Sequence, residues 1–67
     1  MQLTINGTPR IFPHPVAAVA DLVRLLGLEG KRIAIERNGA IVPKSRYADT
    51  PLAEGDRLEI VGAVGGG

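Results

Sequence analysis

The segment VAAVADLVRLLGL, residues 16–28, has a hydrophobic period that differs from the rest of the chain. Four apolar residues recur there at i, i+3, i+4 and i+7, the spacing of one helix face. They are Val19, Leu22, Val23 and Leu26. Gly27 suits the left-handed conformation that ends a helix. Ala17 and Ala18 stand where a capping Ser, Thr, Asp or Asn is usual, so we expect the first turn to fray. The pattern predicts one amphipathic helix from about Val16 to Leu26.

Short alternating segments lie on both sides of this helix. Asn6-Gly7 and Asn38-Gly39 are hairpin signals, because both residues of each pair tolerate a positive φ. Each pair separates two short segments that alternate in hydrophobicity, as half-buried strands do. We therefore predict strands at residues 3–5, 10–12, 33–36, 41–42 and 57–61, with one helical turn around Ser45 to Tyr47.

This order of elements predicts an α+β fold, in which one main helix packs on one face of a mixed sheet of four to five strands. The first and last strands alternate most cleanly and contain no proline, so we expect them to be neighbours in the middle of the sheet. Residues 1–62 would form the folded domain and residues 63–67 a flexible C-terminal glycine tail. The predicted core consists of Leu3, Ile5, Phe12, Val19, Leu22, Leu26, Leu28, Ile33, Ile35, Leu52, Leu58 and Ile60.

Composition and charge narrow the class of protein. The chain has 67 residues, 45% of them hydrophobic, and its eight basic and seven acidic residues give a net charge of +1. That length makes one domain, and that balance gives no electrostatic reason to expect a nucleic acid or a membrane as partner. Cysteine is absent, which excludes a disulfide, a thiolate metal site and a thiol nucleophile. No apolar run approaches the roughly 20 residues that span a bilayer, so we expect a soluble, cytoplasmic protein.

The polar side chains that could support catalysis or bind a metal are isolated from one another. His14 is the single histidine and has no cysteine near it, so we expect no metal site. Ser45 has no histidine close in sequence and no flanking glycines of a nucleophile elbow. We interpret the remaining candidates as turn residues or ordinary solvated surface: Glu54, Asp56, Glu59, Lys44, Arg46 and Tyr47.

The glycine-rich end is the most distinctive chemical feature of the sequence. Four of the nine glycines lie in the last six residues, and Gly65, Gly66 and Gly67 are consecutive. Glycine loses the most freedom on ordering, and without Cβ atoms these residues can thread through a slot too narrow for side chains. Five or six extended residues would reach roughly 17–20 Å. On these residues alone, a frayed terminus and a functional carboxylate remain open alternatives.

A terminal carboxylate is a poor electrophile until it is activated. A partner enzyme can join it to AMP from ATP as a mixed anhydride, and a sulfur nucleophile such as a persulfide can then displace AMP. The product would be a terminal thiocarboxylate, which stores sulfur without needing a cysteine in the carrier. Glycine suits that position because it does not crowd attack at the acyl carbon.

The whole chain resembles the ThiS family, the sulfur carriers of thiamine biosynthesis, which are small β-grasp (ubiquitin-like) proteins. The order, spacing and placement of several short motifs support the resemblance, and the glycine-rich ending is the most specific of them. These motifs are Ile5-Asn6-Gly7, Val19-Ala20-Asp21-Leu22, Leu26-Gly27-Leu28, Asn38-Gly39, Ile41-Val42-Pro43, Glu54-Gly55-Asp56 and residues 59–67.

The resemblance implies a set of partners and no bound cofactor. A ThiF-type adenylyltransferase, related to the ubiquitin-activating enzymes, would use ATP to adenylate Gly67. A cysteine desulfurase or a rhodanese-like protein would supply sulfur, and a ThiG-type thiazole synthase would accept it. Gly66 and Gly67 match the functional diglycine of the family. Ala18 and Gly62 depart from its pattern, since relatives often have a capping threonine at the first position and histidine or glutamine at the second.

Three alternatives to the thiamine carrier remain on sequence grounds. One is the related carrier for molybdopterin synthesis, another is a ubiquitin-like modifier joined to lysines through Gly67, and the third is a plain binding module. We expect no catalytic residue, since the protein would be a co-substrate. The partner-binding surface is predicted near the tail and consists of Val61, Val64, Arg57 and Glu59.

Overall fold

The computed structural model describes residues 1–62 of the chain and contains five strands, one α-helix and one 3-10 helix within them. These elements follow the predicted order. Their bounds are β1 Gln2–Ile5, β2 Thr8–Ile11, α1 Val19–Leu25, β3 Ile33–Arg37, β4 Ala40–Val42, η1 Lys44–Asp49 and β5 Arg57–Gly62. The short helical turn expected around Ser45 to Tyr47 is the 3-10 helix η1.

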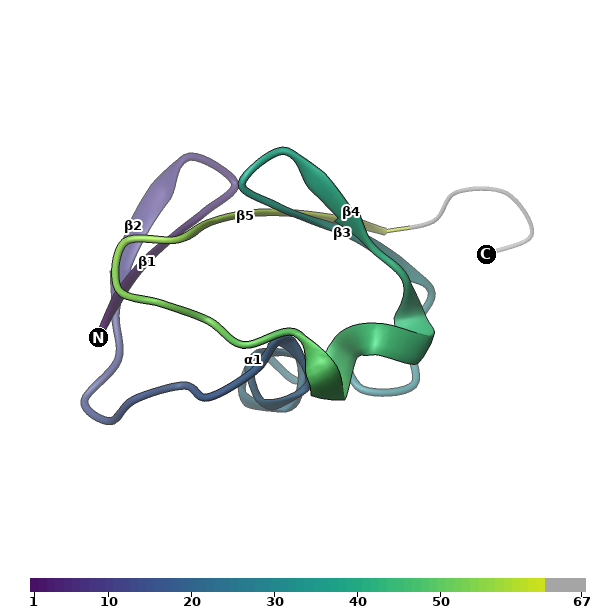
Figure 1. The fold of residues 1–67 in the computed structure, drawn as a ribbon, viewed down its shortest axis with the longest axis horizontal. Coiled ribbons are helices and arrows are strands. Elements are labelled where there is room, and N and C mark those ends of the chain that lie inside the picture. The colour runs from purple at the N-terminus through teal and green to yellow at the C-terminus, as the bar shows by residue number, and fades with distance from the viewer. Residues whose placement is uncertain (63–67) are drawn as a thin grey trace.

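The strands form one mixed sheet in the order β2-β1-β5-β3-β4. β1 and β5 are parallel neighbours at its centre, and the other neighbouring pairs are antiparallel. Figure 1 shows α1 and η1 on the same side of this sheet. The predicted α+β arrangement and the central pairing of the first and last strands are both confirmed.

Both predicted hairpin turns are present and have the expected backbone. Asn6 and Gly7 have φ angles of 51° and 80°, and Asn38 and Gly39 have φ angles of 51° and 87°. A positive φ at both central residues is the mark of the type I′ turn, whose twist matches that of the flanking strands. The two turns fix the registers of β1 with β2 and of β3 with β4.

Helix α1 is shorter than predicted, and Asp21 in its first turn bonds back to the N-cap residue. The Asp21 Oδ2 atom accepts a hydrogen bond of 3.0 Å from the backbone N–H of Ala18, the N-cap residue. A carboxylate in the first turn also interacts favourably with the helix dipole. Ala18 provides no side-chain cap, as predicted, but the expectation of a frayed first turn overlooked this contribution from Asp21.

The C-terminus of α1 follows the sequence prediction closely. Gly27 has a φ of 71°. Its N–H bonds to the Arg24 carbonyl at 3.1 Å, and the Leu28 N–H bonds to the Val23 carbonyl at 2.9 Å. This pair of bonds is the Schellman arrangement, which satisfies carbonyls that the helix itself leaves free.

The hydrophobic core lies between the sheet and the two helices. Most predicted core residues are buried, but Phe12, Leu26, Leu28 and Ile33 are only partly buried and pack at its margin. The prediction also omitted three buried valines, Val16, Val23 and Val42. The buried apolar residues are Leu3, Ile5, Val16, Val19, Leu22, Val23, Ile35, Val42, Leu52, Leu58 and Ile60.

Asp56 is a buried charged residue at the start of β5, with a relative exposure of 7%. Its carboxylate accepts hydrogen bonds from Arg37 Nε at 2.8 Å, Asn38 Nδ2 at 3.0 Å and the Ala53 N–H at 2.8 Å. These bonds fasten the β3–β4 hairpin to the loop that leads into β5. The Asp56 N–H bonds to the Ala53 carbonyl at 3.1 Å, as expected of a turn residue, but the burial of its carboxylate was not predicted.

The surroundings of Asp56 act on its pKa in opposite directions. Burial is the largest effect and raises the pKa, but the hydrogen bonds from Ala53, Asn38 and Arg37 and the positive charge of Arg37 together outweigh it. The net result is a pKa below the ordinary value of an aspartate. The ionised carboxylate is therefore favoured in the folded state, and its loss of charge would destabilise the fold.

We predict that Asp56→Asn lowers the free energy of unfolding at neutral pH by about 2 kcal/mol, because it breaks a charged network around buried groups. Since the folded-state pKa is depressed, this stabilisation is present above the unfolded pKa of about 3.9 and disappears as the pH falls through the folded pKa. The variant should consequently lose less stability than the parent as the solution is acidified below about pH 4.

Urea unfolding at a series of pH values measures both effects. The control is Asp49→Asn, which alters an exposed aspartate on η1. Equal acid sensitivity of the parent and Asp56→Asn would contradict the role assigned to this carboxylate.

Candidate functional site

The central strand β5 supports the base of the predicted tail. It lies between β1 and β3, and its last residue, Gly62, is paired with Ile33 of β3. Gly62 is also the last residue that the structure describes. Val64 and the predicted threading residues Gly65, Gly66 and Gly67 lie outside the described residues. The structure therefore fixes the point from which the glycine segment leaves the sheet.

Three of the four residues predicted to bind partners share the outer face of the sheet. Along β5, exposed residues alternate with the buried Leu58 and Ile60. Arg57, Glu59 and Val61 therefore point away from the helices, and Val61 is 58% exposed. The structure places these three residues on one surface, with Val61 beside Gly62 and Arg57 at the opposite end of β5.

The neighbours of these residues make the outer face mixed in character. Glu59 lies opposite Glu36 of β3, and Ile41 of β4 lies opposite Glu36 on its other side. Ile41 is 76% exposed. Like charges directly opposite each other on a sheet are destabilising by a few tenths of a kcal/mol or more.

The ion pairs within residues 1–62 do not relieve this repulsion. They are Arg24–Asp21, Arg24–Glu29 and Arg37–Asp56. Neither glutamate of the cross-strand pair takes part in one of them. The Glu36–Glu59 repulsion does not stabilise the fold. A surface with such a pair suits contact with another molecule.

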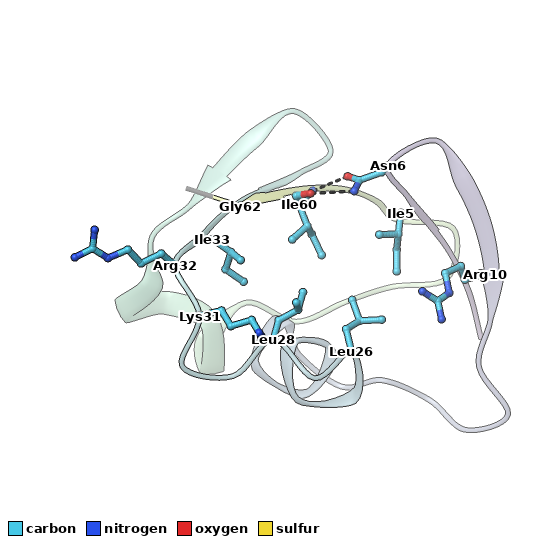
Figure 2. Close-up of a pocket in the computed structure, with 10 residues that line it drawn as sticks. All are labelled: Ile5, Asn6, Arg10, Leu26, Leu28, Lys31, Arg32, Ile33, Ile60 and Gly62. Atoms are coloured by element: carbon cyan, nitrogen blue, oxygen red, sulfur yellow. Dashed lines mark hydrogen bonds between the residues drawn. The ribbon is translucent and has the colours of Figure 1, made fainter. Parts of the chain in front are cut away.

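Asn6 supports the far end of β5 through its side chain. β1 ends at Ile5, whereas β5 continues to Gly62. Asn6 Oδ1 accepts a bond of 2.7 Å from the Ile60 N–H, and Asn6 Nδ2 donates a bond of 2.9 Å to the Ile60 carbonyl (Figure 2). The amide thus takes the place of the next peptide of β1. The sequence indicated the turn at this position but gave no signal for this second role.

A groove of about 440 Å³ opens between the sheet and the C-terminal end of α1 (Figure 2). Its floor is aliphatic and its margin is basic. Gly62 lies on its edge, so the groove reaches the base of the tail. The lining residues are Ile5, Asn6, Arg10, Leu26, Leu28, Lys31, Arg32, Ile33, Ile60 and Gly62. This groove could not be predicted from sequence patterns, because the groove forms from segments that are distant in the chain.

The remaining polar candidates stay apart in the structure. His14 is exposed in the loop before α1, and Ser45 is exposed on η1. Within residues 1–62 there is no group of three or more His, Cys, Asp or Glu side chains that could hold a metal ion. No helix in the described part of the chain is long and apolar enough to cross a membrane.

With the fold and the base of the tail established, comparison with known proteins identifies the family. Residues 3–67 match the ThiS family. The chain belongs to the ThiS family. The match runs through the glycine segment as well as the folded part, in agreement with the resemblance found in the sequence motifs.

Two curated relatives extend this result. The "Sulfur carrier protein ThiS" of Bacillus subtilis is 37% identical over 65 residues, covering 97% of this chain and 98% of that protein. A "Thiazole synthase" of Paramagnetospirillum magneticum is 46% identical over 67 residues, which are the whole of this chain but 20% of that protein. The chain therefore spans about a fifth of the length of this thiazole synthase.

The fold also matches a solved structure of the family. The crystal structure of a thiamine biosynthesis protein (ThiS) from Geobacter metallireducens superposes with a TM-score of 0.87 and 28% identity, and both chains are covered completely. The five-stranded mixed sheet with one helix is thus the β-grasp fold of ThiS proteins.

The support that Asn6 gives to β5 can be tested by substitution. Asn6→Gly removes both bonds to Ile60 but keeps a residue that accepts the φ of 51° at this position. We expect the free energy of unfolding to fall by about 1–2 kcal/mol and the Ile60 amide to exchange its hydrogen faster.

Hydrogen exchange followed by NMR measures this directly. The Leu26 amide, bonded to the Leu22 carbonyl at the C-terminal end of α1, is the internal reference. Unchanged exchange at Ile60 relative to Leu26 would show that the Asn6 side chain does not hold the end of β5.

Proposed function

We propose that this protein is a sulfur carrier, which holds sulfur as a thiocarboxylate on Gly67 and donates it for the thiazole moiety of thiamine. The observation that carries the proposal is the ThiS family match over residues 3–67, since it includes the glycine segment itself. The relative from Bacillus subtilis, which is matched over nearly its whole length, is a sulfur carrier protein. In this role the protein is a co-substrate of other enzymes and not a catalyst.

The chemistry begins with activation of the Gly67 carboxylate. A carboxylate oxygen attacks the α-phosphorus of ATP in a ThiF-type adenylyltransferase, and pyrophosphate leaves. The terminal sulfur of a persulfide then attacks the acyl carbon, and AMP leaves. A thiol cleaves the resulting acyl disulfide, becomes part of a disulfide itself, and releases the thiocarboxylate. ATP is a substrate of the partner, so the carrier needs no cofactor of its own, and we propose the cytoplasm as its compartment.

The fold suits this role because it separates a rigid body from a narrow reactive end. β5 is held on both sides, by β1 and Asn6 on one and by β3 on the other. From Gly62, five further residues can extend roughly 17–18 Å. A partner can therefore take the glycine segment into its active site while it contacts the folded domain outside.

Different observations support the different partners. Thiazole synthase is supported by the relatives of that name from Paramagnetospirillum magneticum and Magnetococcus marinus, whose matched segments cover this whole chain. The adenylyltransferase and the sulfur donor, a cysteine desulfurase or rhodanese-like protein, follow from the chemistry that a thiocarboxylate requires. We propose that the outer face of the sheet docks onto these partners through Arg57, Glu59 and Val61, together with Val64.

The sulfur-carrying role can be tested by mass spectrometry of the intact protein. After incubation with ATP, the cognate adenylyltransferase and a sulfur source, we expect a mass gain equal to exchange of one oxygen for one sulfur, located at Gly67. Removal of Gly66 and Gly67 should abolish the gain without unfolding the domain, because β5 ends before them.

Mass spectrometry and assays of the two biosynthetic products together separate the alternatives. Attachment of Gly67 to lysine side chains would indicate a ubiquitin-like modifier. Support of molybdopterin synthesis but not of thiazole synthesis would indicate the related carrier. Normal thiamine synthesis in cells that contain the truncated chain would contradict the proposal altogether.

The docking role of the outer face can be tested at Arg57. We expect Arg57→Glu to weaken binding to the adenylyltransferase about tenfold, mainly through a slower association rate, because it reverses a charge at the contact surface. Arg46→Glu on η1 makes the same change of net charge on another part of the surface and should leave binding unchanged. Equal affinities of the two variants, measured by surface plasmon resonance, would exclude Arg57 from the docking surface.

A further inference from the structure

The groove between the sheet and the end of α1 is a second surface at the base of the tail, on the other side of the sheet from the outer face. We propose that it receives an acidic, apolar peptide segment of thiazole synthase when the carrier docks to donate its sulfur. This inference rests on the proposed function and adds to it a contact site and the chemistry of the partner's segment.

The positive charges around the groove favour an acidic occupant. Arg10 comes from β2, and Lys31 and Arg32 come from the loop between α1 and β3, and all three side chains are exposed. Among residues 1–62, no acidic residue lines the groove. Within residues 1–62, none of these cations takes part in an ion pair. Carboxylates on a partner would therefore meet positive charge that the described residues leave uncompensated.

The aliphatic floor of the groove favours a partner segment that has apolar side chains between its carboxylates. Leu26, Leu28 and Ile33 are only partly buried, although they pack against the hydrophobic core. Apolar groups from a partner would remove this remaining surface from water, at roughly 25 cal/mol per Å².

The placement of the charges favours a peptide over a compact anion such as free phosphate. In Figure 2, Lys31 and Arg10 lie on opposite sides of Leu26 and Leu28, and Arg32 points away from the groove. The Arg10 guanidinium lies 5.9 Å from the centre of the Phe12 ring, which helps to hold it on its side. Cations that flank an aliphatic floor, without converging on one point, fit a segment with acidic and aliphatic residues in alternation.

The position of Gly62 connects the groove to sulfur transfer. Gly62 lines the groove and is also the residue from which the glycine segment continues. Any enzyme that draws residues 63–67 into its active site must approach this edge of the domain. Thiazole synthase is the partner that we commit to, because two relatives of this chain carry that name.

Charge reversal in the groove tests the proposal. We expect the double variant Arg10→Glu/Lys31→Glu to bind the cognate thiazole synthase about tenfold more weakly or worse than the parent. The difference should shrink as salt is added. Its matched control is Lys44→Glu/Arg46→Glu, which changes the net charge equally on η1, outside the groove. Thermal unfolding of both variants establishes that the domain remains folded.

Cross-linking identifies the partner's segment. The chain contains no cysteine, so Lys31→Cys and, as control, Arg46→Cys each provide one site for a photoreactive label. We expect the label at position 31 to attach to thiazole synthase at a peptide that contains Asp or Glu beside aliphatic residues. The label at position 46 should not attach to that peptide.

The outcomes distinguish this inference from the proposed function. If the groove variant and its control bind thiazole synthase equally, or if the label at position 31 attaches to a basic segment or only to the adenylyltransferase, the inference is wrong. Sulfur loading of the parent chain is measured separately by mass. A parent that cannot be loaded would overturn the proposed function, whereas a loaded parent with no groove contact would overturn the inference alone.

Discussion

The parallel pairing of β1 with β5 is the constraint on which the rest of the structure depends. It brings the beginning and the end of the domain together at the centre of the sheet. The last strand is therefore supported on both sides, and the residues beyond Gly62 start from a firm element. Parallel strands require a long crossover, and here α1, the β3–β4 hairpin and η1 all lie within that connection. The anchored exit of the glycine segment is thus a consequence of the topology.

Local sequence patterns predicted the elements well, because their causes are local. Asn-Gly pairs favour a positive φ wherever they stand, and Gly27 ends α1 for the same reason. The side-chain roles of Asn6 and Asp56 could not be predicted in this way, since their partners lie far away in sequence. Asn6 bonds to Ile60, 54 residues away, and Asp56 bonds to Arg37, 19 residues away. Polar contacts of this kind become visible only when the sheet has been assembled.

The candidate site could be predicted only in part, for a related reason. Alternation along β5 placed Arg57, Glu59 and Val61 on one face correctly, because a strand has a fixed period of two. The groove was not predicted because it lies between elements that are distant in sequence. No pattern within a single element indicates it. Its floor includes Leu26 and Leu28, which the sequence assigned to the core, and the structure leaves them partly open at the end of α1. The incomplete burial of Leu26 and Leu28 is what reveals the groove, and the sequence alone does not show it.

The outer face and the groove lie on opposite sides of β5 and differ in charge. The outer face carries both signs of charge, with Glu36 and Glu59 directly opposite each other and Arg57 beside them, whereas among residues 1–62 the groove has only basic charged residues at its margin. A carrier must present one reactive end to more than one enzyme in turn. The outer face is proposed to contact each of these partners, and the groove would add a contact that thiazole synthase alone makes. The net charge of the chain is only +1, yet charge is distributed unevenly between the two sides of β5. Selection between successive partners can act at this strand.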